Sequence, residues 1–168
     1  MKRLGKSSAG FTLLETLSAL VVLSVGLVGI VLLQMKTTQF NRDAYFATQA
    51  TIIAHDMLER VRANVSGEKA GHYHLPDPIR HAGCFSAAGC SPLQMAQSDM
   101  HEWAANTAYN IASRIPAGDG VICIDSTPDD GTPSVASCDN LGSVYAIKVW
   151  WTGADGVQQR FVTTASLI

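Results

Sequence analysis

One carboxylate stands alone in the longest apolar stretch of this sequence. Between Ala9 and Lys36, Glu15 is the only ionisable side chain. An acid at the centre of a membrane helix costs roughly 2.5–3.5 kcal/mol on insertion scales, and less near the interface. Such an acid usually has a cationic partner, because a charge in a medium of low dielectric constant needs an opposite charge nearby. We therefore expect Glu15 to have a functional ion-pairing role.

Four cysteines form the second group of chemically reactive residues. They all follow the apolar stretch, at Cys84, Cys90, Cys123 and Cys138. An even number of cysteines beyond a membrane segment indicates disulfides in an oxidising compartment. Pairing of neighbours along the chain is the simplest arrangement, and a Cys123–Cys138 bridge would add roughly 3 kcal/mol of stability. Crossed pairings of the four cysteines are the alternative.

Metal binding and catalysis have weaker support. His72, His74 and His81 lie near Cys84 and Cys90 and form a conceivable metal cluster, but no C-x-x-C pair accompanies them. An oxidising compartment also favours cystine over thiolate. The sequence has no G-x-S-x-G motif and no glycine-rich phosphate loop after a strand. We expect no metal, no cofactor and no enzymatic activity.

The composition allows one modest domain in addition to the apolar segment. The chain has 168 residues, of which 47% are hydrophobic and only 15% are charged. The formal net charge of −2 gives no reason to expect a nucleic-acid partner. Without the first ten residues, nine basic and fourteen acidic side chains remain, for a net charge of −5.

The apolar segment Phe11–Leu33 is long enough to cross a bilayer as a helix, since it spans 23 residues. Lys2, Arg3 and Lys6 precede it and should stay on the cytoplasmic side. The segment is too long for a cleaved signal peptide, and no A-x-A site follows it. A plain signal anchor is the alternative, but it does not account for Glu15. We expect a single pass through a membrane, with the C-terminal part outside the cytoplasm.

These residues carry a family resemblance. The run Gly10-Phe11-Thr12-Leu13-Leu14-Glu15 resembles the processing site of type IV pilins and of the pseudopilins of type II secretion. The resemblance implies that a membrane aspartyl peptidase, the prepilin peptidase, cuts after Gly10 and methylates the new N-terminal Phe11. It also implies that Glu15 pairs with the N-terminal amine of a neighbouring subunit during assembly.

The apolar helix is expected to continue beyond the membrane. An apolar stripe at helical spacing is formed by Phe46, Ala50, Ile53, Met57, Leu58 and Val61. No proline interrupts residues 11–65, so one helix of roughly 50–55 residues is predicted. The predicted organisation is a leader at 1–10, a transmembrane half-helix at 11–33, an amphipathic half-helix at 34–65 and a periplasmic globular domain at 66–168.

The globular region is predicted to hold one extra short helix and a small antiparallel sheet. Ser91-Pro92 is typical of a helix start, and an apolar pattern follows at Met100, Trp103, Thr107, Ile111 and Ile115. Strands are predicted at residues 120–125, 144–151 and 157–164, with a turn-rich excursion at 127–142. Alternation in the second strand places Trp151 in the core and Trp150 toward solvent or a partner. The fold class is therefore α+β and pilin-like.

The globular region also resembles one branch of the family, the PilV-type minor pilins or type IV pilus modification proteins. The resemblance lies in Cys84…Cys90, Trp103, the run 115–121 and the pattern Tyr145-x-Ile147-x-Val149-x-Trp151. Members of that group usually have Leu-Pro-Gly-Gly in the middle element, whereas this chain has Ala117 in place of the first glycine.

The resemblance implies a structural subunit of a type IV pilus that acts at initiation or at the tip of the fibre. Its partners would be prepilin peptidase, other minor pilins, the major pilin, the pilus assembly platform and the inner membrane. The first alternative is a minor pseudopilin of a type II secretion system, which shares the leader, the helix and the acid. The second is a membrane-anchored binding module that does not polymerise.

Overall fold

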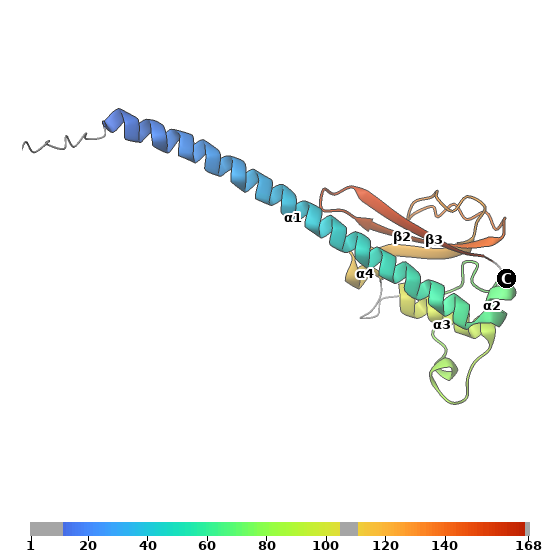
Figure 1. The fold of residues 1–168 in the computed structure, drawn as a ribbon. Coiled ribbons are helices and arrows are strands. Elements are labelled where there is room, and N and C mark those ends of the chain that lie inside the picture. Colours follow the sequence, from blue (N-terminus) through green and yellow to red (C-terminus); the bar gives the residue numbers. More distant parts are fainter. Residues whose placement is uncertain (1–11, 105–110, 167–168) are drawn as a thin grey trace, which may run out of the picture. The chain divides into compact units, whose positions relative to one another are not determined.

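The computed structural model describes residues 12–104 and 111–166. The chain divides into two compact units, with the division after residue 40. The elements, drawn in Figure 1, are α1 (Leu13–Ala63), α2 (Val65–Lys69), the 3₁₀ helix η1 (Ala82–Phe85), α3 (Pro92–Ala104), α4 (Ile111–Arg114), β1 (Asp119–Ile124), β2 (Val144–Thr152) and β3 (Gln158–Ser166). The architecture is α+β, as the sequence predicts.

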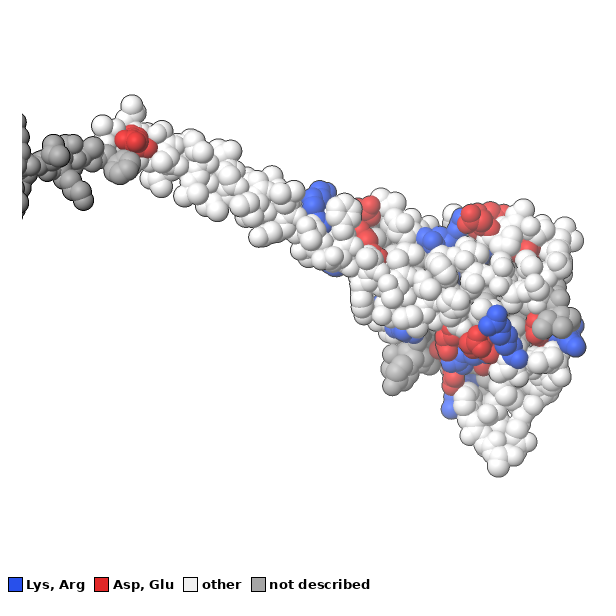
Figure 2. Space-filling view, viewed as in Figure 1, with Lys and Arg blue, Asp and Glu red and all other residues white. Residues whose placement is uncertain are grey.

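The N-terminal unit contains the apolar part of α1. Every residue from 13 to 38 is exposed, although an 18-residue window of the helix has a mean hydropathy of 2.6. Within the described residues, α1 is the one helix whose length and composition would allow it to cross a membrane. Figure 2 shows the stretch between Glu15 and Lys36 without charged residues. This surface is unsuited to water, because its exposed side chains are almost all apolar.

The later part of α1 belongs to the globular unit and buries one face. The predicted apolar stripe is confirmed, since Ala50, Ile53, Met57 and Leu58 are buried. Asn64 ends the helix, and its side-chain oxygen accepts a hydrogen bond from Gly67 N at 3.1 Å, which caps α2. The sequence reading takes residues 64–67 as a plain break and does not include this five-residue helix.

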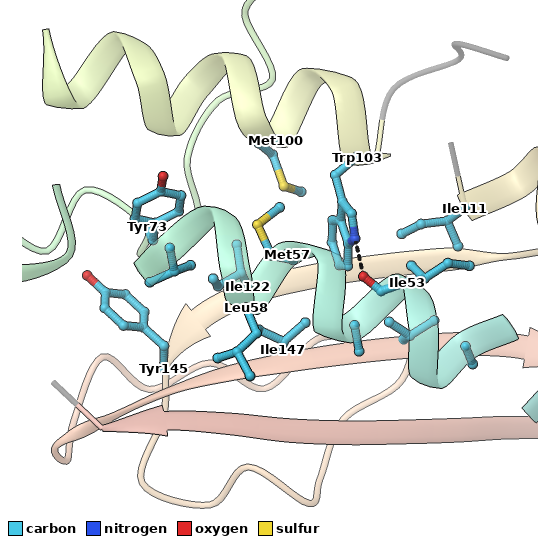
Figure 3. Close-up of a cluster of buried hydrophobic side chains, with 14 of the residues drawn as sticks. Ile53, Met57, Leu58, Tyr73, Met100, Trp103, Ile111, Ile122, Tyr145 and Ile147 are labelled. Carbon is cyan, nitrogen blue, oxygen red and sulfur yellow. Dashed lines mark hydrogen bonds between the residues drawn. The ribbon is translucent and has the colours of Figure 1, made fainter. Parts of the chain in front are cut away.

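Three antiparallel strands in the order β1-β2-β3 form the sheet. Its register places Ile147 opposite Ile122 on one side and opposite Thr163 on the other. Figure 3 shows the core between sheet and helices, where the Trp103 indole N–H donates to the Ile53 carbonyl at 2.8 Å. A Cβ atom at Gly120 would lie 2.7 Å from the Trp103 ring, so the close approach of β1 to α3 requires glycine there.

The second face of the sheet is also covered, which corrects the expectation for Trp150. Both tryptophans are buried, with 2% of Trp150 and 5% of Trp151 exposed. The 127–142 excursion lies against the side of the sheet that carries Lys148 and Arg160, because both side chains donate to its carbonyl groups. Alternation therefore identifies the two faces correctly, but it does not reveal that a loop covers the second one.

The helical region predicted after Pro92 corresponds to α3 and α4 among the described residues. Ser91 caps α3 as predicted, with its hydroxyl oxygen accepting from Gln94 N at 3.3 Å. Met100 and Trp103 are buried on α3, and Ile111 is buried on α4. Residues 105–110, which include the predicted stripe member Thr107, lie outside the described part of the chain.

Candidate functional site: the first turn of the long helix

The processing site and the acid predicted from the sequence fall at the start of α1. Gly10 and Phe11 lie outside the described residues, so the structure gives no geometry for the peptide bond between them. Thr12 occupies the N-cap position of α1, and its hydroxyl oxygen accepts a hydrogen bond from Glu15 N at 3.3 Å. Threonine at the cap and glutamate three residues later form the sequence of a capping box. Glu15 is thereby fixed in the first helical turn.

The Glu15 carboxylate is exposed and has no ion pair or hydrogen bond with any described residue. An acid in the first turn interacts favourably with the helix dipole, but by only about 0.3–1 kcal/mol. This gain is smaller than the cost of taking an unpaired carboxylate out of water, which is several kcal/mol. In an apolar medium, Glu15 therefore needs a cation from outside the described chain, and an ammonium group can supply both charge and hydrogen bonds.

The cysteines pair with their neighbours along the chain. Cys84 is bonded to Cys90 next to η1, and Cys123 in β1 is bonded to Cys138 in the 127–142 excursion. No cysteine is free. The second bridge fastens the excursion to the edge strand β1, at the fully buried Cys123.

A buried lysine holds the same excursion. Lys148 in β2 is fully buried, and its ammonium contacts the buried Asp125 carboxylate at 2.6 Å and the Asp130 carboxylate at 2.8 Å. It also donates to the Ala136 carbonyl at 2.9 Å. Hydrogen bonds from Lys148 and from the Thr127 hydroxyl keep the pKa of Asp130 below its ordinary value. Four oxygen atoms of the excursion and of Asp125 thus surround one ammonium group.

Sequence reasoning misses this lysine cluster. The signal in the sequence is a single Lys148 within the apolar strand Val144–Thr152, preceded by an excursion rich in aspartate. A charged residue inside an otherwise apolar strand is buried only when it is paired. The cluster serves to hold the loop on the sheet, because each of its oxygen atoms already faces the ammonium group.

Two of the histidines considered for metal binding, His74 and His81, have separate hydrogen-bond partners. His74 Nδ1 accepts from Ile124 N at 3.0 Å, and His81 Nε2 pairs with the Gln97 side chain at 2.8 Å. Among the described residues, three potential ligand groups come together only at Cys123, Asp125 and Cys138. The two sulfurs there are bonded to each other, so neither is a thiolate. The Asp125 carboxylate in that group already contacts Lys148.

A second polar cluster joins the end of α1 to α3. Arg60 pairs with Asp99 at 3.3 Å, and the Tyr73 hydroxyl donates to Asp99 at 2.5 Å. Burial, and then the hydrogen bond to Asp99, raise the pKa of Tyr73 well above its usual value. The adjoining cavity of about 180 Å³ is smaller than typical ligand pockets of roughly 300–1,000 Å³. This cluster is best described as a polar junction of three segments.

Comparison with known proteins identifies only the N-terminal segment. Residues 5–31 match the prokaryotic N-terminal methylation motif. This stretch contains the leader residues from Gly5, the Gly10–Phe11 junction, Glu15 and most of the apolar segment. No curated protein and no solved structure matches the chain.

Proposed function

Because residues 5–31 carry the N-terminal methylation motif, which indicates a prepilin of the type IV pilin or pseudopilin type, we propose that this chain is a minor pilin of a type IV pilus. Prepilin peptidase cuts between Gly10 and Phe11 and methylates the new amine of Phe11. The observation that carries the proposal is the position of Glu15, an unpaired acid at the start of an exposed apolar helix, five residues after the cut.

Assembly follows from the electrostatics of this segment. After cleavage, Phe11 of each subunit has a free ammonium group in the region where the helix surface is apolar. Glu15 of one subunit pairs with this ammonium group of its neighbour, so that two charges that are costly to bury are neutralised together. The pair sets the axial register of adjacent helices. Other minor pilins, the major pilin and the assembly platform are the partners in this step.

Before assembly, residues 11–33 anchor the protein in the inner membrane and residues 66–168 lie in the periplasm. Two features support this placement. The apolar half of α1 has the length and composition of a membrane span, and two disulfides in the globular unit require an oxidising compartment. After assembly, the protein is part of the fibre or of its tip.

The backbone conformation of Ala117 supports the PilV-type assignment, although the residue itself departs from that group's pattern. Ala117 stands where the group usually has glycine, yet its φ angle is 48°, in the left-handed region that favours glycine. The backbone therefore adopts the conformation that explains the usual glycine. The neighbouring Ile115 is buried in the core, as expected for an element that positions β1.

The function is tested by replacing Glu15 with leucine in the full chain. Glu15→Leu should enter the membrane and be cut at Gly10 as efficiently as wild type, because the substitution removes a charge and lies beyond the cut. It should be absent from sheared fibres. Ser18→Leu is the matched control, since it replaces another exposed polar residue one turn further along the helix. Normal amounts of Glu15→Leu in fibres would contradict the proposed ion pair.

Fractionation of the wild-type protein and deletion of its gene distinguish the alternative functions. A pseudopilin of type II secretion would be missing from surface fibres, and its deletion would abolish protein secretion while leaving pili intact. A membrane-anchored binding module would stay in the membrane fraction and would not co-purify with other pilins. Recovery of the processed wild-type protein in sheared pili, together with secretion that is unaffected by deletion, supports the pilus subunit.

A further inference from the structure

The buried pair of Lys148 and Asp125 departs from an ordinary ion pair. Both side chains are completely inaccessible to solvent, although burying two charges together is costly. Lys148 Nζ lies 2.6 Å from Asp125 Oδ2, yet this oxygen accepts no hydrogen bond from any described residue. The contact is therefore as close as a charge-assisted hydrogen bond but lacks the alignment of one.

The protons of the Lys148 ammonium group are directed to other oxygen atoms. A lysine ammonium group has three N–H donors. Three oxygen atoms of the 127–142 excursion accept from Nζ, namely Asp130 Oδ1 at 2.8 Å, the Ala136 carbonyl at 2.9 Å and the Asp130 carbonyl at 3.2 Å. These acceptors account for all three donors, so the nitrogen and the Asp125 carboxyl group are held together without a proton aligned between them.

The carboxyl carbon of Asp125 is close to the nitrogen. The contact from Nζ to Oδ2 is 2.6 Å, and a carbon–oxygen bond of this kind is about 1.2 Å long. Cγ of Asp125 therefore lies no more than about 3.8 Å from Nζ. Reacting atoms held about 3–3.5 Å apart have a large kinetic advantage over free reactants. A small movement of either side chain is enough to reach that range.

The surroundings of the pair exclude water. The strand register places Cys123, Ala146 and Trp150 on the same face of the sheet as Lys148. Each of these three side chains is buried, with at most 2% exposed. In such a medium the two charges are not solvated, and water has no access to hydrolyse a bond formed between the two groups.

We propose that Lys148 and Asp125 condense to an intramolecular amide, an isopeptide bond between β2 and the residue that follows β1. One proton of the ammonium group passes to the Asp125 carboxylate, which leaves a neutral amine and a carboxylic acid. The nitrogen lone pair attacks Cγ and the new C–N bond forms. Asp130 takes a second proton from the nitrogen and delivers it to the departing hydroxyl group, so the C–O bond breaks and one water molecule leaves.

The product suits the interior better than the ion pair does. Two buried charges are replaced by one neutral amide, and its remaining N–H group can donate to the Ala136 carbonyl, which Nζ already contacts. Asp130 is a proton carrier and not the second reactant, because 44% of its side chain is exposed and its carboxylate stays solvated. The bond forms within the globular unit and requires neither cleavage at Gly10 nor fibre formation.

Tryptic mapping of the full-length protein gives the first test. Lys148 is the only trypsin site between Arg114 and Arg160, and trypsin does not cut after a lysine whose amine is acylated. After purification in detergent and reduction and alkylation of the disulfides, we expect one fragment of residues 115–160 that lacks the mass of one water molecule. Asp125 and Lys148 both lie in this fragment, so fragment ions from cuts between them should be missing in tandem mass spectra.

The wild-type result decides the proposal without any substitution. Separate fragments 115–148 and 149–160 at full mass overturn it. Loss of water with normal cleavage after Lys148 also overturns it, because that pattern indicates a cyclic imide at an aspartate. Lys148→Met is the negative control, since it lacks both the amine and the trypsin site, and its fragment 115–160 should have full mass.

The role of Asp130 is tested by the rate of bond formation. Full-length protein is made by cell-free synthesis into micelles under oxidising conditions, and the fraction of the dehydrated fragment is followed with time. Asp130→Asn keeps an oxygen atom for Lys148 but cannot carry a proton, so the rate should fall about a hundredfold or more. Asp129→Asn is the matched control, because Asp129 pairs with Arg160 and not with Lys148. Equal rates for the two variants overturn the assignment of Asp130 as the proton carrier.

Discussion

The two units of this chain differ in how many of their residues pack within the chain. In the N-terminal unit, every residue from 13 to 38 is exposed and contributes nothing to a core. In the globular unit, the helices and the sheet bury a contiguous cluster that includes Met57, Trp103 and Ile147. Yet the N-terminal segment is the one that matches a known motif, and the well-packed unit matches nothing.

This difference shows that the segment with a recognisable sequence motif need not be the segment with a packed core. In the proposed function, the N-terminal segment must suit partners outside the chain, and a peptidase, a bilayer and a neighbouring helix each demand particular residues at fixed spacing. A core demands only apolar side chains of suitable volume, which many sequences provide. Substitutions in the N-terminal unit should therefore leave the stability of the globular unit unchanged. Substitutions in the globular unit should leave the processing of the N-terminal unit unchanged.

The largest expected effect is on processing. Gly10→Val should abolish cleavage, because a branched side chain crowds the peptide bond where glycine leaves room. Intact-mass measurement of the membrane-extracted protein checks this. Gly5→Val, at the other glycine of the leader, should be cut normally. The globular unit of the uncut variant should keep its melting temperature, and mature-size Gly10→Val protein at wild-type level would contradict the site.

The next largest effect is on the stability of the globular unit and not on processing. Lys148→Met leaves Asp125 buried without its counter-charge, so the free energy of unfolding should fall by about 3–5 kcal/mol. Urea unfolding in micelles, followed by tryptophan fluorescence, reports only this unit, because all three tryptophans lie in it. The double variant Lys148→Met/Asp125→Asn should recover part of the loss. Cleavage at Gly10 should be unchanged, and a processing defect would refute the separation of the units.

The two disulfides should contribute different amounts to the free energy of unfolding. Chain-entropy arguments give about 3 kcal/mol for the 15-residue Cys123–Cys138 separation and about 2 kcal/mol for the 6-residue Cys84–Cys90 separation. Paired alanine substitutions at each bridge, compared by urea unfolding, measure both values. A larger loss from removing Cys84–Cys90 would indicate that the loop around η1, in which no residue is buried, carries more structure than its exposure suggests.

The smallest effect appears at alkaline pH. The folded state keeps Tyr73 protonated, because burial raises its pKa, whereas an unfolded tyrosine ionises near pH 10. The folded state therefore holds more protons above pH 10, and the free energy of unfolding should fall there by about 1.4 kcal/mol per pH unit for this residue. Tyr73→Phe should remove that part of the slope between pH 10 and 11. Tyr45→Phe, which removes an exposed hydroxyl, should leave the slope unchanged.

Periodicity was sufficient to predict most of the fold. The stripe on α1 and the alternation in β2 arise directly from burial of one helix face and one sheet face, so residues such as Ile53 and Ile147 were assignable to the core. The start of α3 was assignable because Ser91 and Pro92 have specific roles at a helix N-terminus. At the functional segment, the single acid Glu15 was conspicuous because its surroundings are apolar.

The covering of the second sheet face was beyond such reasoning. Irregular segments have no period, so nothing in residues 127–142 revealed which surface they would cover. Burial of Trp150 and the pairing of Lys148 with Asp125 both depend on that placement. The identity of the edge strands, β1 and β3, was equally hidden, since an edge is a property of strand order, which a list of strands does not contain.

The Cys123–Cys138 bridge has a mechanical consequence for a protein tethered through one helix. The Cα atoms of the two residues are 6.1 Å apart, although 15 positions separate them in the chain. If a load stretched the globular unit, this loop would withhold about 45 Å of contour length that an unbridged chain of the same size would release. The excursion would stay a closed ring beside β1 even after the strands had separated, so the unit would extend about 45 Å less than its residue count suggests.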